Sequence, residues 1–343
     1  MIATCLFYLG GELLLNFVAN RIRLPSHKNN TRYMPAIRKK GEQNVQILTY
    51  HRVNDENDPF FAGIPIETFA RQMEYLSARF TIWPLEQVVE GMKKKDIPHN
   101  TLVVTFDDGY ADNYFNAYPI LKAYRIPATI FLTTDVIGTN GELWHDRIFS
   151  AFRETQVESL TWDADRGRVY PLSTVEQRLY AQSCVLQLLW SVGEEQRLQW
   201  VDRLSTALKV KAGQVRPRLM LTWDEIQVMQ RGGVAFGGHT CSHPILSKLS
   251  PVRIQTEILE SKRILEEHLQ QPVTTFAYPN GRKCDFDETT KSLLREAGYQ
   301  CAVTTVFGRN EIGQDLFELH RGRPWETHLP AFAMKLNWYK LAV

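Results

Sequence analysis

The sequence LVVTFDDGY, Leu102–Tyr110, joins a short apolar run of strand type directly to two carboxylates and a glycine. Runs of this kind recur along the chain, with helical patterns between them. The candidate strands are Val45–Tyr50, Leu102–Phe106, Ala128–Leu132, Val234–Gly237, Thr274–Ala277, Ala302–Val306 and Leu316–Leu319. Strands that alternate with helices predict a parallel α/β sheet, and about seven repeats favour a barrel over an open sheet.

Apolar residues at helical spacing predict amphipathic helices between these strands. Examples are Ile66–Arg79, Tyr114–Tyr124, Pro251–Leu269 and Asp287–Ala297. One interval breaks the rhythm: residues 138–221 are rich in Trp, Arg and Gln, with a helical stretch near Val175–Leu208. We therefore expect one barrel domain over residues 44–343 with a helical insertion at about 138–221, which would form a lid or a wall of a cleft.

The composition is that of an ordinary folded protein, with 44% hydrophobic and 23% charged residues among 343. A formal net charge of +2 argues against electrostatic capture of nucleic acid. The five cysteines are scattered and include no C-x-x-C pair, which argues against a disulfide framework and a structural zinc site. This cysteine usage favours a reducing compartment.

Residues 1–43 differ from the rest of the chain. Residues 2–18 are largely apolar but make a poor signal peptide and a poor membrane span, whereas an amphipathic helix there would suit a membrane interface. Residues 21–40 carry seven basic side chains and no acid, which would suit an anionic membrane surface. We expect peripheral membrane contact through residues 1–40; the alternative is a helix packed on the domain with a solvated basic linker. The expected location is membrane-associated or cytoplasmic, with a secreted or periplasmic one not excluded.

Polar side chains follow several candidate strands at the point where each strand ends. In a barrel of parallel strands the active site forms at the carboxyl ends of the strands, so these side chains should converge on one rim. The residues in such positions are His51, Asp107, Asp108, His239, Tyr278, Pro279, Asn280, His320 and Arg321.

Asp107 and Asp108 would be costly to bury together without a counter-charge, and a divalent metal is the simplest remedy. His239 and His243 are four residues apart, which places two imidazoles on one face of a helical turn. Alone, the Asp pair could be a turn and the His pair an exposed helical turn. Together they predict a metal site with one carboxylate and two histidines, and with open positions for water and substrate.

With these motifs the chain resembles the polysaccharide deacetylase superfamily, carbohydrate esterase family four, from about Val45 to Trp325. The matching motifs are Thr105–Tyr110, His239–Pro244 and Phe276–Gly281. The resemblance implies a distorted (β/α) barrel of seven strands. It also implies that Asp107 is the general base and that Asp108, His239 and His243 hold a divalent metal, with Zn²⁺ the first choice.

The same resemblance implies further roles at the cleft. A backbone N–H within Tyr278–Asn280 would stabilise the oxyanion. The departing amine needs a proton, for which we prefer His51 over His320, because relatives that begin with a similar Y-H-R-V strand use that first histidine. The arginine that braces the base in many relatives is replaced by Ala277, and Arg321 or Arg323 could take its place.

The function implied is removal of the acetyl group from N-acetylhexosamine residues of a polysaccharide or glycoconjugate. Alternatives are metal-dependent hydrolysis of an O-acyl or phosphate ester, and a catalytically silent glycan-binding protein. Release of amine together with acetate separates the first reaction from ester hydrolysis. The complete set of carboxylates and histidines argues against the silent protein. Trp325 is either an aromatic wall for a sugar ring or a core residue.

Overall fold

The computed structural model describes residues 44–210 and 217–339. The predicted amphipathic helix and basic segment therefore lie outside the described residues. Within the part of the chain that is described, no helix has the length and apolar character needed to cross a membrane.

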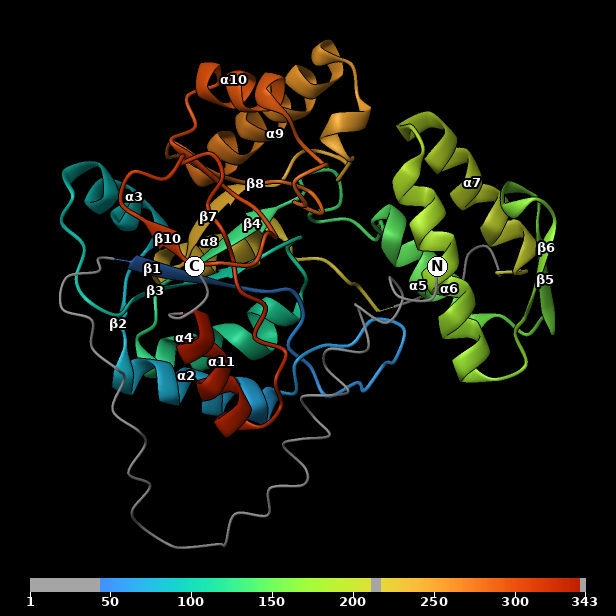
Figure 1. Cartoon of the computed structure of the whole chain (residues 1–343), viewed down its shortest axis with the longest axis horizontal. Helices are drawn as coiled ribbons and strands as arrows, with labels where there is room; N and C mark the ends of the chain where they lie inside the picture. The colour runs from blue at the N-terminus through green and yellow to red at the C-terminus, as the bar shows by residue number, and fades with distance from the viewer. Residues whose placement is uncertain (1–43, 211–216, 340–343) are drawn as a thin grey trace, which may run out of the picture.

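A curled sheet forms the centre of the molecule (Figure 1). Its order is β10-β1-β3-β4-β7-β8-β9, with β2 also pairing with β3. The strands are β1 (Asn44–Tyr50), β2 (Thr81–Ile82), β3 (Thr101–Phe106), β4 (Ala128–Leu132), β7 (Ala235–Gly238), β8 (Thr275–Ala277), β9 (Cys301–Val303) and β10 (Asn310–Glu311). All pairings are parallel except that of β10 with β1. The predicted α/β class is confirmed, with the sheet curled into a half-barrel.

The prediction of a strand at Leu316–Leu319 was wrong. This segment makes only an isolated parallel bridge between Leu319 and Val303, because residues 315–318 form a turn. The carboxylate of Asp315 accepts a hydrogen bond from the backbone N–H of Phe317, 2.9 Å away, and such local bonds compete with a ladder. The segment nevertheless spans the gap between β9 and β1, since Gly322 donates to the Ile47 carbonyl at 2.7 Å.

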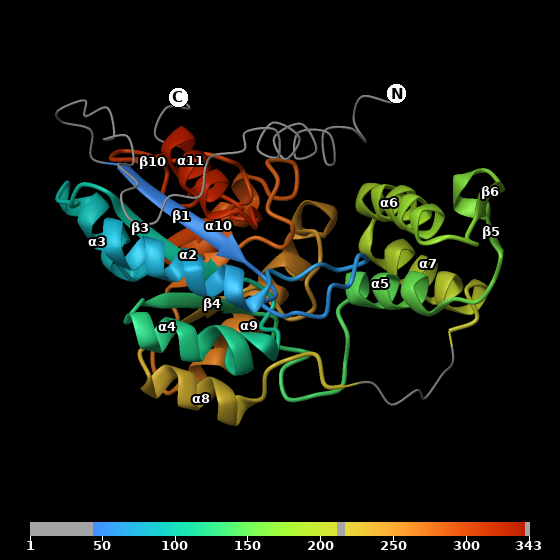
Figure 2. The ribbon, with the colours of Figure 1, turned by 90° about the horizontal axis from the view of Figure 1, so that it is seen from below.

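Helices cover the outside of the sheet, and Figure 1 and Figure 2 show them on both sides of it. They are α2 (Ile66–Arg79), α3 (Leu85–Lys94), the π-helical turn Asn113–Ala117 continued by α4 (Tyr118–Tyr124), α8 (Trp223–Arg231), α9 (Pro251–Leu269), α10 (Glu288–Glu296) and α11 (Leu329–Tyr339). Every residue of β3 and β4 is buried, as expected for parallel strands covered on both faces.

The alternation of side chains along β3 positions the site. Val103 packs in an interior cluster with Val45 and Ile47, and two-residue periodicity places Thr105 and Asp107 on the same face, farther toward the carboxyl end. The barrel therefore has an apolar floor and a polar rim.

The interval that breaks the strand–helix rhythm folds as a lobe beside the barrel (Figure 2). It contains α5 (Trp144–Glu154), a hairpin of β5 (Ser159–Trp162) and β6 (Arg168–Pro171), α6 (Val175–Ser191) and α7 (Glu194–Ala207). The hairpin was not expected from the sequence. The lobe has its own apolar core, in which Phe152, Leu160 and Val185 are among the buried side chains. We call residues 144–207 the insertion lobe.

Candidate metal centre and catalytic cleft

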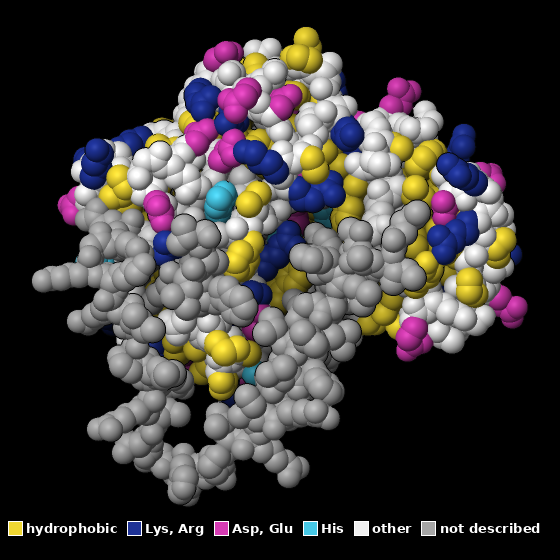
Figure 3. Space-filling view, in the orientation of Figure 1, with side chains coloured by type: hydrophobic (Ala, Val, Ile, Leu, Met, Phe, Trp, Pro, Cys, Tyr) yellow, Lys and Arg dark blue, Asp and Glu magenta, His cyan; other side chains and the backbone are white. Residues whose placement is uncertain are grey.

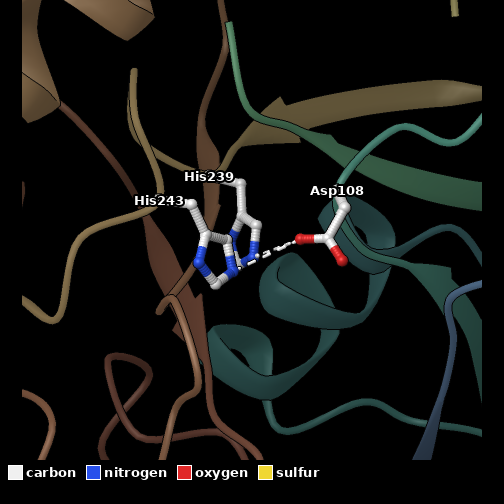
Figure 4. Close-up of side chains that lie close together, drawn as sticks. All are labelled: Asp108, His239 and His243. Carbon is white, nitrogen blue, oxygen red and sulfur yellow. Dashed lines mark ion pairs between the residues drawn. The ribbon is translucent and has the colours of Figure 1, made fainter. Parts of the chain in front are cut away.

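Three buried side chains, Asp108, His239 and His243, face one another beyond the carboxyl ends of β3 and β7 (Figure 4). The Nε2 atoms of His239 and His243 lie 3.4 and 3.3 Å from Oδ1 of Asp108. Each residue offers one ligand atom, and the three atoms all lie within 4.8 Å of one another. The structure thus brings together the three side chains that the sequence pattern predicts as metal ligands.

Left-handed backbone turns the ligands toward one another. Asp108 has φ = 73° and His243 has φ = 59°, values that cost free energy for a residue with a side chain. Gly109 follows with φ = 86°, and a Cβ there would lie 2.7 Å from the side chain of Leu132. Only glycine fits this turn, which directs Asp108 away from the barrel interior and toward the two imidazoles.

The loop that carries the histidines is held by Glu257, a buried residue of α9. Its carboxylate accepts hydrogen bonds from the backbone N–H groups of Cys241 and Ser242 at 2.9 and 3.0 Å, and from the Ser242 hydroxyl at 2.8 Å. In addition, His239 Nδ1 lies 2.7 Å from the Ala277 carbonyl, which orients the ring so that Nε2 faces Asp108.

A divalent cation fits this set of donors. Oδ1 of Asp108 is buried and accepts no hydrogen bond from the residues that the structure describes, although both imidazoles approach it, and such an atom is costly without a cation. Burial alone would raise the pKa of Asp108, but the two histidines outweigh it and hold this pKa well below its usual range. One anionic oxygen and two imidazole nitrogens are the ligand types that zinc prefers.

Asp107, the preceding residue, belongs to a different interaction. Its two carboxylate oxygens accept a bidentate pair of hydrogen bonds from Arg321, each 2.7 Å long. The guanidinium is buried and also donates to the Thr304 carbonyl. Burial raises the pKa of Asp107, but the charge and hydrogen bonds of Arg321 outweigh this and leave it lowered. Of the two arginines considered for the brace, Arg321 therefore occupies the position.

His51 lies beside Asp107 at the end of β1. Its Nε2 atom is 3.9 Å from Oδ2 of Asp107, and its side chain is 32% exposed to the cleft. The Asn113 amide donates to the His51 carbonyl at 2.7 Å and ties the two loops together. Burial lowers the pKa of His51 below its ordinary value, while the neighbouring carboxylates oppose that shift.

The third motif places only one of its three candidate residues at the cleft. Tyr278 is buried, stacks on Phe286 and donates its backbone N–H to Val303, while Pro279 has no N–H to give. Asn280 lines the cleft, and its backbone N–H makes no hydrogen bond within the described residues. The expected oxyanion donor is thereby narrowed from Tyr278–Asn280 to Asn280.

His320 lies apart from this group. Its backbone exchanges hydrogen bonds with the side chain of Asn310 near β10, and its ring is not among the side chains that line the cleft. Adjacent residues of extended chain point to opposite sides, so Arg321 reaches Asp107 while His320 does not. The alternative assignment of His320 as the proton donor finds no support in this placement.

The cleft itself lies between the barrel and the insertion lobe and has a volume of about 240 Å³. Figure 3 shows basic and histidine side chains in this hollow. The barrel contributes His51, Asp107, Asp108, His239, His243, Asn280, Arg282, Arg323 and Trp325. Trp325 is 41% exposed, which places it in the cleft wall and not in the core.

Comparison with known proteins assigns the family, because the polysaccharide deacetylase profile matches residues 94–302. The chain belongs to the polysaccharide deacetylase family. YxkH of Bacillus subtilis (strain 168), whose polysaccharide deacetylase name is provisional, is 25% identical over 281 residues, covering 81% of this chain and 71% of that protein. The poly-β-1,6-N-acetyl-D-glucosamine N-deacetylase of Staphylococcus epidermidis is 32% identical over 116 residues, which cover 29% of this chain and 40% of that protein.

Solved structures of deacetylases share the fold of this family member. The deacetylase PplD of Streptococcus pyogenes gives a TM-score of 0.55 at 21% identity, with 82% of this chain and 93% of that chain covered. IcaB of Ammonifex degensii gives 0.54 at 19% identity, covering 88% and 98%.

The residues that the insertion lobe adds to this cleft were not predicted from the sequence. His145, Phe149, Leu186 and Trp190 line it from α5 and α6. His145 packs against His243 with ring centroids 4.8 Å apart, and the Trp144 indole donates to the His243 carbonyl at 3.1 Å. The signal was the sequence Trp-His-Asp at 144–146, but it follows no candidate strand and so did not meet the strand-end criterion.

Proposed function

We propose that this protein is a metal-dependent hydrolase that removes the N-acetyl group from N-acetylhexosamine residues of a polysaccharide or glycoconjugate. The observation that carries the proposal is the buried set of Asp108, His239 and His243 directly beside the carboxylate of Asp107, which Arg321 braces. Membership of the polysaccharide deacetylase family supports it.

Asp108, His239 and His243 would hold the ion, for which Zn²⁺ is the first choice. When bound, such an ion supplies Lewis-acid polarisation of a carbonyl and lowers the pKa of a coordinated water. Three protein ligands leave coordination positions open, as a catalytic site requires.

The protein's own groups would divide the proton transfers. Asp107 is held ionised by Arg321, and its Oδ1 keeps a lone pair that no hydrogen bond among the described residues uses, so it can accept the proton of the attacking water. His51 lines the cleft within 3.9 Å of Asp107 and can give a proton to the departing amine. The backbone N–H of Asn280 can donate to the oxygen that becomes negative.

The names of the relatives support an N-acetylglucosamine polymer as the substrate, since the staphylococcal proteins are named poly-β-1,6-N-acetyl-D-glucosamine N-deacetylases. Peripheral membrane contact through residues 1–40 stays a prediction from the sequence. Co-sedimentation of the full chain with anionic and neutral vesicles would test it.

The test measures acetate and free amine released from N-acetylglucosamine oligomers by the zinc-loaded protein. We expect equimolar release that a chelator abolishes. Asp107→Asn should lower kcat by about 10²–10⁴-fold, the usual contribution of a general base, while the bound zinc stays stoichiometric. If the protein released acetate from an O-acetylated glycan and no free amine from the N-acetylglucosamine oligomers, the activity would be ester hydrolysis and not N-deacetylation. No release from either substrate by the zinc-loaded protein would overturn it.

A further inference from the structure

The two histidines of the candidate metal centre are held by different kinds of contact. His239 has a partner for the ring nitrogen that faces away from Asp108, since its Nδ1 lies 2.7 Å from the Ala277 carbonyl. Histidines that bind metals almost always have such a partner, which fixes the orientation of the ring. The Nδ1 atom of His243 is buried and makes no hydrogen bond with the residues that the structure describes. The orientation of His243 must therefore come from other contacts.

The backbone of His243 also needs support. Its φ of 59° lies in the left-handed region, as does the φ of 68° at Thr240 in the same loop. Such conformations persist only where the surrounding contacts impose them. Within the loop, the backbone N–H of His243 donates to the Thr240 hydroxyl at 3.1 Å. The carbonyl of His243 is held by the insertion lobe, because it accepts a hydrogen bond from the indole N–H of Trp144 at 3.1 Å.

Trp144 is itself fixed within the insertion lobe. It is the first residue of α5, is 3% exposed and belongs to the apolar core of the lobe. The guanidinium of Arg197, a fully buried residue of α7, lies 5.3 Å from the centroid of its ring. Arg197 in turn donates to the carbonyls of Leu189 and Val192, each at 3.0 Å. A continuous set of buried contacts therefore joins α7 to the backbone of His243.

The other neighbours of His243 do not replace this contact. His145 packs its ring on that of His243, but its Nε2 atom lies 3.2 Å from the Tyr110 hydroxyl and no hydrogen bond joins the two histidines within the described residues. Glu257 holds the two residues before His243 and not His243 itself. In the described part of the chain, Trp144 is thus the one side chain outside the loop that hydrogen-bonds to the backbone of His243.

We propose that Trp144 is a positioning residue for the metal centre, which acts by holding the backbone of His243 so that Nε2 faces Asp108. This inference rests on the metal site of the proposed function. Nε2 of His243 lies 3.3 Å from Oδ1 of Asp108, and a turn of the loop would move it away (Figure 4). Because coupling between two sites is reciprocal, metal binding should in turn stabilise the start of α5. The insertion lobe then controls metal affinity without providing a ligand.

Trp144→Phe tests the proposal because it keeps an aromatic ring and removes the donor. Competition with a chromophoric chelator should show a zinc affinity lower by about tenfold, at the lower end of what groups that orient metal ligands contribute. Trp162→Phe is the matched control, since Trp162 is also a buried tryptophan of the lobe core and its indole N–H makes no hydrogen bond with the described residues. Zinc affinity should not change in this control.

Equal losses of zinc affinity in the two variants would assign the effect to the stability of the lobe core and would overturn the proposal. An unaltered zinc affinity in Trp144→Phe would overturn it as well. If no acetate is released from N-acetylglucosamine oligomers by the zinc-loaded protein, but Trp144→Phe alone still weakens zinc binding, the positioning role holds and the proposed function fails. Circular dichroism checks that both variants fold.

A measurement on the unaltered protein needs no substitution. Nuclear magnetic resonance follows the exchange of each indole N–H with solvent, with and without zinc. Zinc should slow this exchange about tenfold at Trp144, as the reciprocal coupling requires, and should not affect it at Trp162. The same exchange rate at Trp144 with and without zinc, or equal slowing at both indoles, would show that the hydrogen bond to His243 is not coupled to metal binding.

Discussion

The barrel and the insertion lobe contribute different kinds of side chain to one cleft. The barrel contributes the charged groups and the candidate metal ligands, among them Asp107, Asp108 and His239. The lobe contributes His145 together with apolar and aromatic side chains such as Trp190. In the proposed reaction the barrel therefore supplies the reacting groups, whereas the lobe shapes the space around them.

The barrel and the insertion lobe also differ in how their side chains are held in place. The barrel groups stand at strand ends, where register and buried ion pairs fix them, as the Arg321 brace on Asp107 shows. The lobe has a separate apolar core and reaches the metal centre through a few contacts, including the Trp144 hydrogen bond to His243. Variants that affect one region but not the other can test whether the two regions have separate roles.

The largest expected effect concerns metal binding. His239→Ala should lower zinc affinity by more than about 100-fold, because it removes one of three ligands. His145→Ala should change it by less than about threefold, although its ring packs on His243. Burial lowers the pKa of His145 to about 3, so it is neutral and able to bind metal, but its Nε2 atom lies 3.2 Å from the Tyr110 hydroxyl and it is not part of the ligand group.

Competition with a chromophoric zinc chelator measures both affinities, with circular dichroism to check the fold. A loss of zinc binding in His145→Ala comparable to that in His239→Ala would show that the insertion lobe is part of the metal centre. The division between the two regions would then be wrong.

The sequence was informative wherever a short apolar run corresponds to a buried strand. Ala128–Leu132 was predicted with its observed ends, and the strand-end criterion selected Asp107, Asp108 and His239. It was less informative where backbone conformation decides the outcome. Within the described residues the backbone N–H of Tyr278 donates to the Val303 carbonyl whereas that of Asn280 makes no hydrogen bond, and no local sequence pattern reveals this difference. His145 was not predicted because its position depends on how a separately folded lobe packs against the barrel.

A smaller effect should follow from loosening the loop that carries the histidines. Glu257→Gln removes the charge from the carboxylate that accepts hydrogen bonds from Cys241 and Ser242. Groups that orient metal ligands typically contribute 10–100-fold to metal affinity, and we expect about tenfold because the glutamine oxygen can still accept. The same chelator competition measures it.

Glu260→Gln on the same helix is the control, since Glu260 pairs only with the exposed Arg263 among the described residues. Zinc affinity in this control should not change. An unaltered zinc affinity in Glu257→Gln would mean that the loop is held by other contacts, and the barrel would be less dependent on α9 than its hydrogen bonds indicate.

The last prediction concerns the ion pairs that stabilise the edge of the barrel at the turn after β10. Lys291 of α10 is buried and contacts Asp315 and Glu318, which flank the turn that replaces the expected last strand. Burial raises the pKa of both acids, but it is outweighed at Asp315 by Lys291 and at Glu318 by Lys283 together with Lys291, so that both pKa values are lowered. A lowered folded pKa gives stability that is present above the ordinary values and lost as the pH falls through the folded ones. The barrel should therefore lose stability progressively below about pH 4.5.

Lys291→Met should cost about 1 kcal/mol at pH 7, since solvent screens the partly exposed acids, and should flatten this acid dependence. Lys283→Met is the matched comparison, because its exposed ammonium contacts Glu318 but not Asp315 among the described residues, so the part of the acid dependence that comes from Asp315 should persist. Chemical unfolding from pH 3 to 7 measures the free energy, and hydrogen exchange locates the change. Faster exchange at low pH should appear in residues 301–322 and not in α6, because the lobe core is apolar. If hydrogen exchange at low pH became equally faster in residues 301–322 and in α6, the ion pairs of Lys291 would not stabilise the barrel independently of the lobe.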